Sequence, residues 1–345
     1  MTARCDAVIV GAGAAGCAAA LNLPRHMSAL LVDRARPGEE RCCGGLIAPD
    51  AQAALAGLRL ELPRSVRTDP APGAVHVTDL DSGREQTYRR AYLNVDRARF
   101  DDWLLRLASR RADFRPGTRL TGAARRDDGL ELELTSGTGR ETVLARFLIG
   151  ADGARSKVRS RFFGNRPLPR TDTALQVTLP ARPGLRLHEV LFSRRLTGFY
   201  AWAIPKSECV LVGSAFADRA TARDNFDRLL AEFCRRLGLA GTVLGRAARP
   251  LTRPRSRADF CPGDSSVLLC GEAAGLVSPS SGEGISWALV SGAAAGRALG
   301  TARPGAAYSR AFGPLAARLG DKFVKSRIIF TPWTRRLALR LPWCP

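Results

Sequence analysis

Three short segments that lie far apart in the chain carry glycines and acidic side chains directly after apolar runs. The run at residues 7–10 leads into Gly11, Gly13 and Gly16, the run at 147–150 leads into Asp152 and Gly153, and the run at 267–270 leads into Gly271 and Glu272. Short apolar runs of this kind are typical of buried strands. Ligands bind at the carboxyl ends of such strands in α/β sheets, so we expect the three segments to meet in one site.

The first segment has the spacing of a dinucleotide-binding turn. Gly11 permits a tight turn, Gly13 lets the backbone approach a pyrophosphate, and Gly16 lets the next helix pack closely. The unpaired N–H groups that begin this helix favour a phosphate, and Asp33, 22 residues after Gly11, can accept hydrogen bonds from a ribose diol. The predicted site contains Gly11, Gly13, Ala14, Ala15, Gly16, Asp33 and Arg34. A glycine-rich turn without a ligand is the alternative, and this segment alone does not separate NAD from FAD.

The two later segments favour FAD. Asp152 and Gly153 follow the second strand, and the carboxylate of Glu272 follows the third, where it could hold the hydroxyls of a ribityl chain. Gly282 and Gly284 would let another helix begin near Ile285, with its first N–H groups toward the flavin ring. The three segments together therefore predict an FAD site.

These blocks resemble the flavoprotein superfamily of para-hydroxybenzoate hydroxylase, and most closely its geranylgeranyl reductase branch. Four segments carry the resemblance: Cys42-Cys43-Gly44-Gly45-Leu46, the run from Asp96 to Leu104, the run from Tyr200 to Lys206, and the block from Gly271 to Gly292. The likeness implies that Arg41, Gly44, Gly45 and Arg97 join the cofactor site. It also implies that Cys43, Tyr200 and Trp202 face the substrate. Glu272 and Ile204 depart from the family pattern, so the fold and the cofactor transfer better than the substrate does.

The expected fold is α/β, with a Rossmann-like FAD-binding domain of the para-hydroxybenzoate hydroxylase type and an interleaved antiparallel β-sheet substrate domain. Residues 1–65, 93–171 and 260–305 form the first domain, residues 66–92 and 172–259 form the second, and residues 306–345 form a basic and apolar helical tail. Local patterns predict a hairpin from strands at 75–78 and 87–90, a half-exposed strand at 130–134, and a helix from about Ala222 to Leu237.

A strand from Phe199 to Lys206 would place Tyr200, Trp202 and Ile204 on one face. This face suits an apolar or planar substrate, with the tyrosine hydroxyl available to orient a polar end, although the rings could also be ordinary core aromatics. Cys43 has three interpretations: a proton donor to carbon after hydride transfer from the flavin, a wall of the pocket, or a buried inert thiol.

Composition indicates the cellular compartment and the kinds of partner that the protein could have. The nine cysteines include no C-x-x-C pair and no metal-like Cys/His spacing, which favours a reducing compartment without a disulfide framework or metal site. No convincing signal peptide and no run of 18 apolar residues is present, so we expect a cytoplasmic protein. The net charge of +21 comes mainly from scattered arginines, a pattern that does not favour specific nucleic-acid binding.

The end of the chain differs from the rest. Between Lys322 and Trp343, basic residues alternate with bulky apolar ones. Such a segment could lie on the anionic inner face of a membrane as a peripheral contact, cover the mouth of a lipid-like pocket, or pack on its own domain.

The leading functional hypothesis is an FAD-dependent oxidoreductase that reduces a C=C bond of an isoprenoid, polyketide-type or other lipid-like molecule. An FAD-dependent monooxygenase using NAD(P)H and O₂ is the alternative, and a non-enzymatic flavin-containing membrane-surface binding protein is a distant third. A halogenase is disfavoured because no lysine precedes Lys157. The electron donor would be NAD(P)H or a ferredoxin-like carrier, and the sequence does not indicate the oligomeric state.

Overall fold

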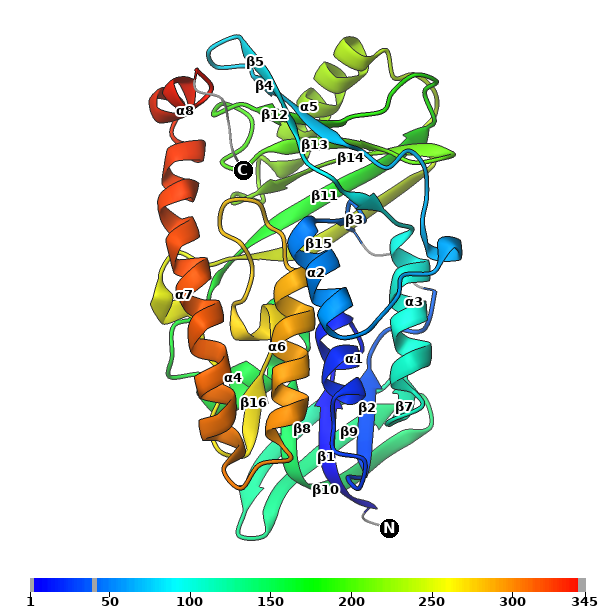
Figure 1. Ribbon diagram of the computed structural model, residues 1–345, viewed down its shortest axis with the longest axis vertical. Coiled ribbons are helices and arrows are strands. Elements are labelled where there is room, and N and C mark those ends of the chain that lie inside the picture. Colours follow the sequence, from blue (N-terminus) through cyan, green and yellow to red (C-terminus); the bar gives the residue numbers. More distant parts are fainter. Residues whose placement is uncertain (1–2, 39–41, 341–345) are drawn as a thin grey trace.

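In the computed structural model, which describes residues 3–38 and 42–340, two seven-stranded sheets lie at opposite ends of the molecule (Figure 1). The first sheet has the order β7-β2-β1-β10-β9-β8, and β16 also pairs with β10. Its strands are β1 (Ala3–Val10), β2 (Ala29–Asp33), β7 (Asp113–Pro116), β8 (Arg119–Arg126), β9 (Gly129–Ser136), β10 (Gly139–Gly150) and β16 (Val267–Leu269).

The long strand β10 joins two kinds of sheet. Its first half pairs antiparallel with β9, which contains the predicted strand at 130–134, whereas its second half pairs parallel with β16. Strand β1 runs parallel to β10 and to β2. Both faces of the parallel part are covered, so Val8, Ile9 and Leu148 are fully buried, as expected for such strands.

The second sheet has the order β15-β11-β14-β13-β12-β4-β5, with β4 and β12 as its parallel pair. Its strands are β4 (Ala74–Asp79), β5 (Arg84–Arg89), β11 (Arg170–Pro180), β12 (His188–Phe192), β13 (Ala201–Pro205), β14 (Cys209–Phe216) and β15 (Gly245–Arg253). The predicted hairpin is confirmed as β4 and β5. The strand predicted from Phe199 is shorter, because regular pairing begins at Ala201. The predicted fold class is confirmed.

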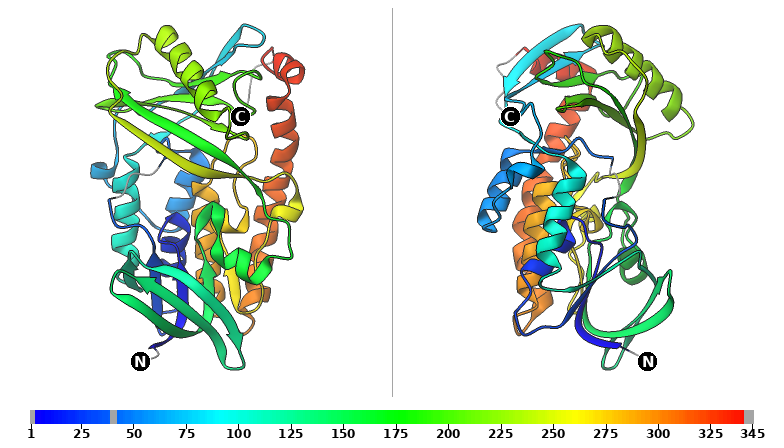
Figure 2. Two further views of the ribbon diagram at one scale, coloured as in Figure 1. Left: turned by 180° about the vertical axis from the view of Figure 1, so that it is seen from behind. Right: turned by 90° about the vertical axis from the view of Figure 1, so that its right-hand side faces the viewer.

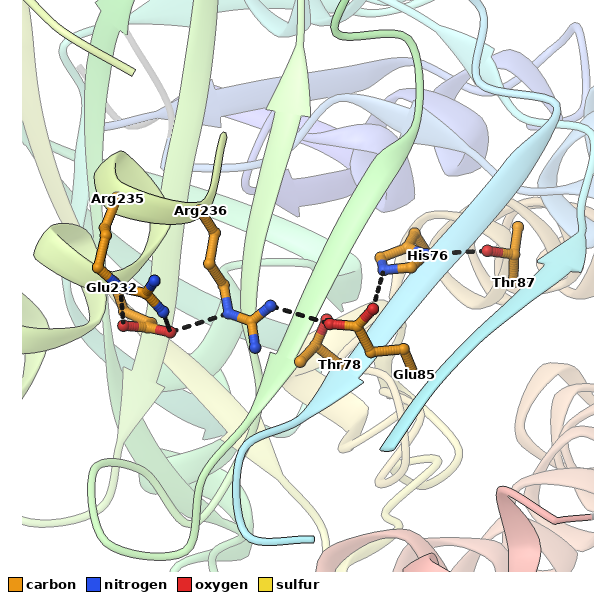
Figure 3. Close-up of polar contacts among 7 residues, drawn as sticks. All are labelled: His76, Thr78, Glu85, Thr87, Glu232, Arg235 and Arg236. Carbon is orange, nitrogen blue, oxygen red and sulfur yellow. Dashed lines mark hydrogen bonds and ion pairs between the residues drawn. The ribbon is translucent and has the colours of Figure 1, made fainter. Parts of the chain in front are cut away.

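Helix α5 (Ala222–Leu237) confirms the predicted helix and covers the outer face of the second sheet (Figure 2). Phe226, Leu229 and Phe233 recur at helical spacing and bury their side chains in the core beneath it. Its polar side is tied to the β4–β5 hairpin, because Arg236 contacts both Glu232 and Glu85 at 2.8 and 2.9 Å (Figure 3). The same figure shows His76, Thr78, Thr87 and Arg235 completing this network.

The remaining helices pack around the first sheet, except α8 (Pro332–Ala338) and the end of α7 (Pro304–Phe330), which pack on the second. The others are α1 (Ala14–Leu21), α2 (Pro49–Gly57), α3 (Arg97–Ala108), α4 (Lys157–Phe163) and α6 (Ile285–Ala298), with short 3-10 turns η1 (Arg64–Val66), η2 (Gly153–Arg155), η3 (Arg257–Asp259) and η4 (Gly271–Ala274). A two-stranded sheet of β3 (Leu46–Ile47) and β6 (Leu93–Asn94) lies between the halves. Helix α3 begins where the Asp96 side chain accepts a hydrogen bond from the backbone N–H of Arg99.

Helix α7 runs most of the length of the molecule (Figure 1). The part of α7 up to Leu319 buries Tyr308, Phe312 and Leu319 in the core of the first sheet, and the Tyr308 hydroxyl donates to the carbonyl of Leu269 at 2.7 Å. Near its end, Ile329 joins a cluster on the second sheet. The helix therefore connects the two halves of the molecule.

Candidate functional site

The three glycine-containing segments meet at one edge of the first sheet. The backbone N–H of Ala151 donates to the carbonyl of Val10 at 2.8 Å, and that of Cys270 donates to the carbonyl of Gly150 at 3.0 Å. The backbones of segments about 250 residues apart therefore lie side by side, as expected, and their binding of a cofactor stays a prediction.

The first turn has the shape that a dinucleotide phosphate requires. A Cβ atom added to Gly16 would lie 1.8 Å from the carbonyl oxygen of Gly11, so only glycine permits this close packing of α1 on the turn. Helix α1 begins after Gly13, and no described side chain caps it. The first N–H groups of the helix, at Ala14 and Ala15, are therefore available to an anion, which fits the phosphates of FAD.

Asp33 is held at the end of β2 by two backbone N–H groups. Its Oδ2 accepts from Ala12 at 2.7 Å and its Oδ1 accepts from Ala35 at 2.8 Å. Each carboxylate oxygen keeps a further acceptor position, so the side chain can still bind a ribose diol. Asp33 also lines a small pocket with Arg36, whereas Arg34 is exposed and does not line it. Arg41 lies outside the described residues.

Asp152 has a structural task at the second segment. Its carboxylate accepts hydrogen bonds from the Ser156 hydroxyl at 2.5 Å and from the backbone N–H groups of Lys157 and Val158 at 2.7 and 3.2 Å. Burial raises the pKa of Asp152, and these hydrogen bonds oppose that rise. The Asp152 side chain thus binds the first backbone N–H groups of helix α4, whose N-cap is Ser156.

Glu272, which follows β16 of the first sheet, contacts β15 of the second sheet. Its Oε1 accepts a hydrogen bond from the backbone N–H of Thr252 in β15 at 2.9 Å, and its Oε2 lies 3.9 Å from Arg249. The N–H of Gly271 donates to the Ser291 hydroxyl of α6 at 2.9 Å. The Glu272 side chain therefore reaches β15, a contact that the sequence did not indicate.

The loop at 278–284 leads into α6, which begins at Ile285 as predicted, with Gly284 at its N-cap. Gly282 donates its N–H to the carbonyl of Ser278 at 2.9 Å. The Tyr200 hydroxyl donates to the carbonyl of Ser281 at 2.7 Å and so anchors the loop. From the sequence we expected this hydroxyl to orient a polar end of the substrate.

An aromatic face of the second sheet lies against the Cys-Gly-Gly loop. The rings of Tyr200 and Trp202 meet edge to face, with 5.9 Å between their centroids. A Cβ atom on Gly44 would lie 2.3 Å from Cδ1 of Ile204, so this loop packs directly beneath the face. The expected juxtaposition of Tyr200, Trp202 and Ile204 is present.

Buried polar atoms on this face lack partners in the part of the chain that the structure describes, and two of the residues that carry them, His188 and Gln176, were not predicted. Within the described chain, both ring nitrogens of His188, Oε1 of Gln176 and Nε1 of Trp202 have no hydrogen-bond partner. His188 and Gln176 are only 7% and 6% exposed. Burial, followed by the charges of Arg90 and Lys206, lowers the pKa of His188 to about 3, so this imidazole is neutral near pH 7.

Cys43 and Cys42 have opposite surroundings. Nη1 of Arg97 donates to Sγ of Cys43 at 3.0 Å, while Nε of Arg97 pairs with Asp101 at 3.1 Å. Burial favours the neutral thiol of Cys43, but the Arg97 charge and hydrogen bonds outweigh it and lower the pKa of Cys43. For Cys42, burial and the neighbouring Cys43 raise the pKa to about 12. Of the two thiols, Cys43 is therefore the one more readily deprotonated.

A groove of about 400 Å³ opens near Gly153 and Glu272 and was also not predicted. Four arginines line it together with Thr173, and none of its described lining residues is acidic: Arg155, Arg219, Arg223 and Arg249. Arg155 lies in η2, Arg219 just before α5, Arg223 in α5 and Arg249 in β15, so only the folded chain brings these side chains together. The groove suits an anionic molecule.

Comparison with known proteins supports a flavin site. Residues 4–312 match the family model described as an FAD binding domain. Protein CbrA of Shigella flexneri serotype 5b is 31% identical over 344 residues, with 97% of this chain and 93% of that protein covered. Protein CbrA of Escherichia coli K12 is 30% identical, with 97% and 96% covered.

Solved structures share the fold at low sequence identity. A geranylgeranyl bacteriochlorophyll reductase-like protein from Thermoplasma acidophilum superposes with a TM-score of 0.84 at 17% identity, covering 99% of this chain and 92% of the other. PqsL, a probable FAD-dependent monooxygenase from Pseudomonas aeruginosa, gives 0.70 at 18% identity, with 97% and 98% covered. At these identities the likeness concerns the fold.

Proposed function

The chain belongs to the FAD-binding-domain family, and on this premise we propose that it is an FAD-dependent oxidoreductase that reduces a C=C bond of an apolar, lipid-like molecule. The observation that carries the proposal is the contact between Arg97 and Cys43 in the loop beneath the aromatic face. A thiol with a lowered pKa at this position can provide a proton to a reacting carbon.

The chain's residues divide the work of holding FAD. The α1 N-terminus would bind the phosphates, Asp33 the ribose, and the edge formed by Gly153, Gly271 and Glu272 the ribityl chain. When bound and reduced, FAD supplies a hydride to the substrate.

Cys43 would supply the proton that completes the reduction. Addition of hydrogen across a C=C bond requires one hydride and one proton, and Sγ of Cys43 can release the proton as the second carbon accepts it. Arg97 then stabilises the thiolate that remains, because its guanidinium already donates to Sγ. Asp101 holds Arg97 in this position through the ion pair at Nε.

The sheet face supports a substrate with an apolar body and one polar group. Tyr200 and Trp202 offer apolar contact, while His188, Gln176 and Nε1 of Trp202 offer hydrogen-bonding atoms that lack partners within the described chain. A hydroxyl or carbonyl on the substrate could satisfy them, since a buried polar group left unpaired is costly.

NAD(P)H is the electron donor that the arginine groove favours. A volume of about 400 Å³ suits a small molecule, and the four arginines can pair with the phosphates of a dinucleotide. Replacing Arg219 and Arg223 by Gln should raise KM for NADPH by roughly tenfold per side chain with little change in kcat. The exposed Arg64 and Arg110 provide a matched pair of control substitutions. Unchanged KM in the groove variants would instead favour a ferredoxin-like carrier.

The decisive experiment is reduction of the purified holoprotein without oxygen, followed by mixing with unsaturated isoprenoids. Reoxidation of the flavin with formation of a saturated product supports the reductase. Reoxidation that requires O₂ and yields a hydroxylated product would establish the monooxygenase instead. A flavin that no donor reduces would support a purely binding role.

A further inference from the structure

The C-terminal end of the described chain exposes large apolar side chains. Val324 and Ile328 lie one turn apart on α7 and are 62% and 39% exposed, and Trp333 and Leu337 lie one turn apart on α8 and are 68% and 51% exposed. Only two other large apolar side chains in the described chain are comparably exposed, Leu168 and Leu244. Exposed apolar groups gathered on two consecutive helices mark an interaction surface.

The same helices and the turn after α8 carry exposed positive charge, with no acidic residue nearby in the sequence. Arg327, Arg336 and Arg340 are exposed, and the chain has no Asp or Glu from residue 322 to residue 340. We call these three arginines and the four apolar residues the C-terminal elbow.

The elbow is firmly anchored on its inner side. Arg335 is 3% exposed, and its Nη2 pairs with Asp79 at 2.8 Å and with Asp81 at 2.6 Å. Its guanidinium also lies over the ring of Phe192, 4.9 Å from the centroid. The exposed apolar side chains therefore belong to a docked structure rather than to a poorly packed terminus.

The inner side of the elbow also borders the aromatic face. Phe330 stacks on Phe199 with 5.3 Å between the centroids, and the Ser326 hydroxyl donates to the carbonyl of Pro279 in the loop before α6 at 3.1 Å. One helix thus contacts the candidate site inside and carries the apolar surface outside.

We propose that the C-terminal elbow docks the protein on the surface of an anionic lipid bilayer. Apolar side chains would enter the interfacial region, and the arginines would pair with lipid headgroups. No helix in the described chain is long and apolar enough to cross a membrane, which is compatible with a contact at the surface. The docking does not depend on the reaction, whereas delivery of a lipid-like substrate through the elbow rests on the proposed function.

The charge pattern favours lipid over a second copy of this chain. A symmetric contact between two elbows would bring three exposed arginines of each copy together, and like charges at close range repel. An anionic bilayer supplies the opposite charge and an apolar layer at the same surface.

Flotation of the holoprotein with vesicles tests the proposal. Binding to phosphatidylglycerol–phosphatidylcholine vesicles is expected, with weak binding to phosphatidylcholine alone and a loss at high salt. Replacing Trp333 and Leu337 by Ser should weaken binding at least tenfold, and so should replacing Arg327, Arg336 and Arg340 by Gln. Matched controls are Leu168→Ser with Leu244→Ser, and Arg64→Gln with Arg110→Gln and Arg228→Gln; these should bind as the unmodified protein does.

Each result separates the docking from the chemistry. Flavin content and reduction by NADPH should stay unchanged in the elbow variants, so loss of vesicle binding alone would support the docking. Absence of binding to anionic vesicles by the unmodified protein would overturn it. Equal weakening by the control substitutions would overturn it as well. So would a lipid-free dimer that becomes monomeric in the Trp333 and Leu337 variant, because a second copy would then cover the elbow.

Discussion

Nη1 of Arg97 lies 3.0 Å from Sγ of Cys43, so the cation at the start of α3 faces the thiol of a loop more than 50 residues earlier in the chain. The charge lowers the pKa of Cys43 although burial acts in the opposite direction. An Arg97→Gln variant should therefore raise the pKa of Cys43 above its ordinary value of 9.0, because burial and the charge of Asp101 are then opposed only by the backbone hydrogen bond at Gly45. The pH dependence of thiol alkylation, with Cys43→Ser as the blank for other cysteines, measures this shift.

Arg97→Lys serves as the control for charge, since it retains a cation without the planar group that also pairs with Asp101. In turnover assays, Arg97→Gln should move the alkaline limb of the rate profile to higher pH. An unchanged alkylation profile in Arg97→Gln would show that Arg97 does not set the thiol's acidity.

Gly16→Ala should impair FAD binding. The added Cβ would lie 1.8 Å from the Gly11 carbonyl oxygen, so α1 must move away from the phosphate turn. We expect loss of bound flavin and a destabilisation of about 1–3 kcal/mol, typical of overpacked sites. Flavin absorbance per protein and thermal unfolding measure both effects. Gly57→Ala in α2 is the matched control, because a Cβ at Gly57 meets no described atom within 4 Å; equal flavin loss in both variants would contradict the prediction.

Glu189→Gln should change how stability depends on pH. Burial and the nearby Glu85 raise the pKa of Glu189 from 4.5 to about 7, with Arg236 opposing. Protonation of Glu189 is therefore easier in the folded than in the unfolded state. The stability that goes with the protonated side chain is fully present below pH 4.5 and is lost as pH rises to about 7. Partial exposure reduces the effect to on the order of 1–2 kcal/mol. The variant should be more stable than the unmodified protein at pH 8 and nearly equal at pH 4; urea unfolding at the two pH values decides, and an equal difference at both would refute the assignment.

His188→Leu should separate folding from substrate binding. Because neither ring nitrogen has a hydrogen-bond partner in the described chain, an apolar replacement should leave the free energy of unfolding unchanged or raise it by about 1 kcal/mol. If the substrate's polar group binds here, KM should rise roughly tenfold. Chemical denaturation and steady-state kinetics test the two halves. Val190→Leu, two residues away on the same face of β12, is the comparison variant. A marked loss of stability in His188→Leu would instead show that His188 has a structural role.

The sequence predicted the parts of the site that depend on local spacing. Gly11, Gly13 and Gly16 define a turn by themselves, and the apolar runs before Gly153 and Gly271 identify strands whose ends must meet. The helix from Ala222 to Leu237 followed from its apolar repeat in the same way.

Other features depend on which strands become neighbours, and periodicity does not contain that information. His188 joins the aromatic face because β12 pairs with both β13 and β4, and β4 lies more than 100 residues earlier. In the sequence, nothing distinguishes Gln176 from other strand residues. The pairing of β11 with β14 places it on the aromatic face. The arginine groove combines residues from distant parts of the chain, which no local pattern connects. Its four arginines also do not stand out in a sequence with arginines throughout.

The contact between Trp202 and Gly213 has a consequence for how this face can vary. The indole lies across Gly213, where a Cβ atom would come within 2.4 Å of the ring. Any side chain at position 213 must displace the indole, and loss of the indole leaves position 213 free to accept a side chain. The residues at positions 202 and 213 should therefore covary among related sequences. Redesign of this face requires substitutions at both positions together.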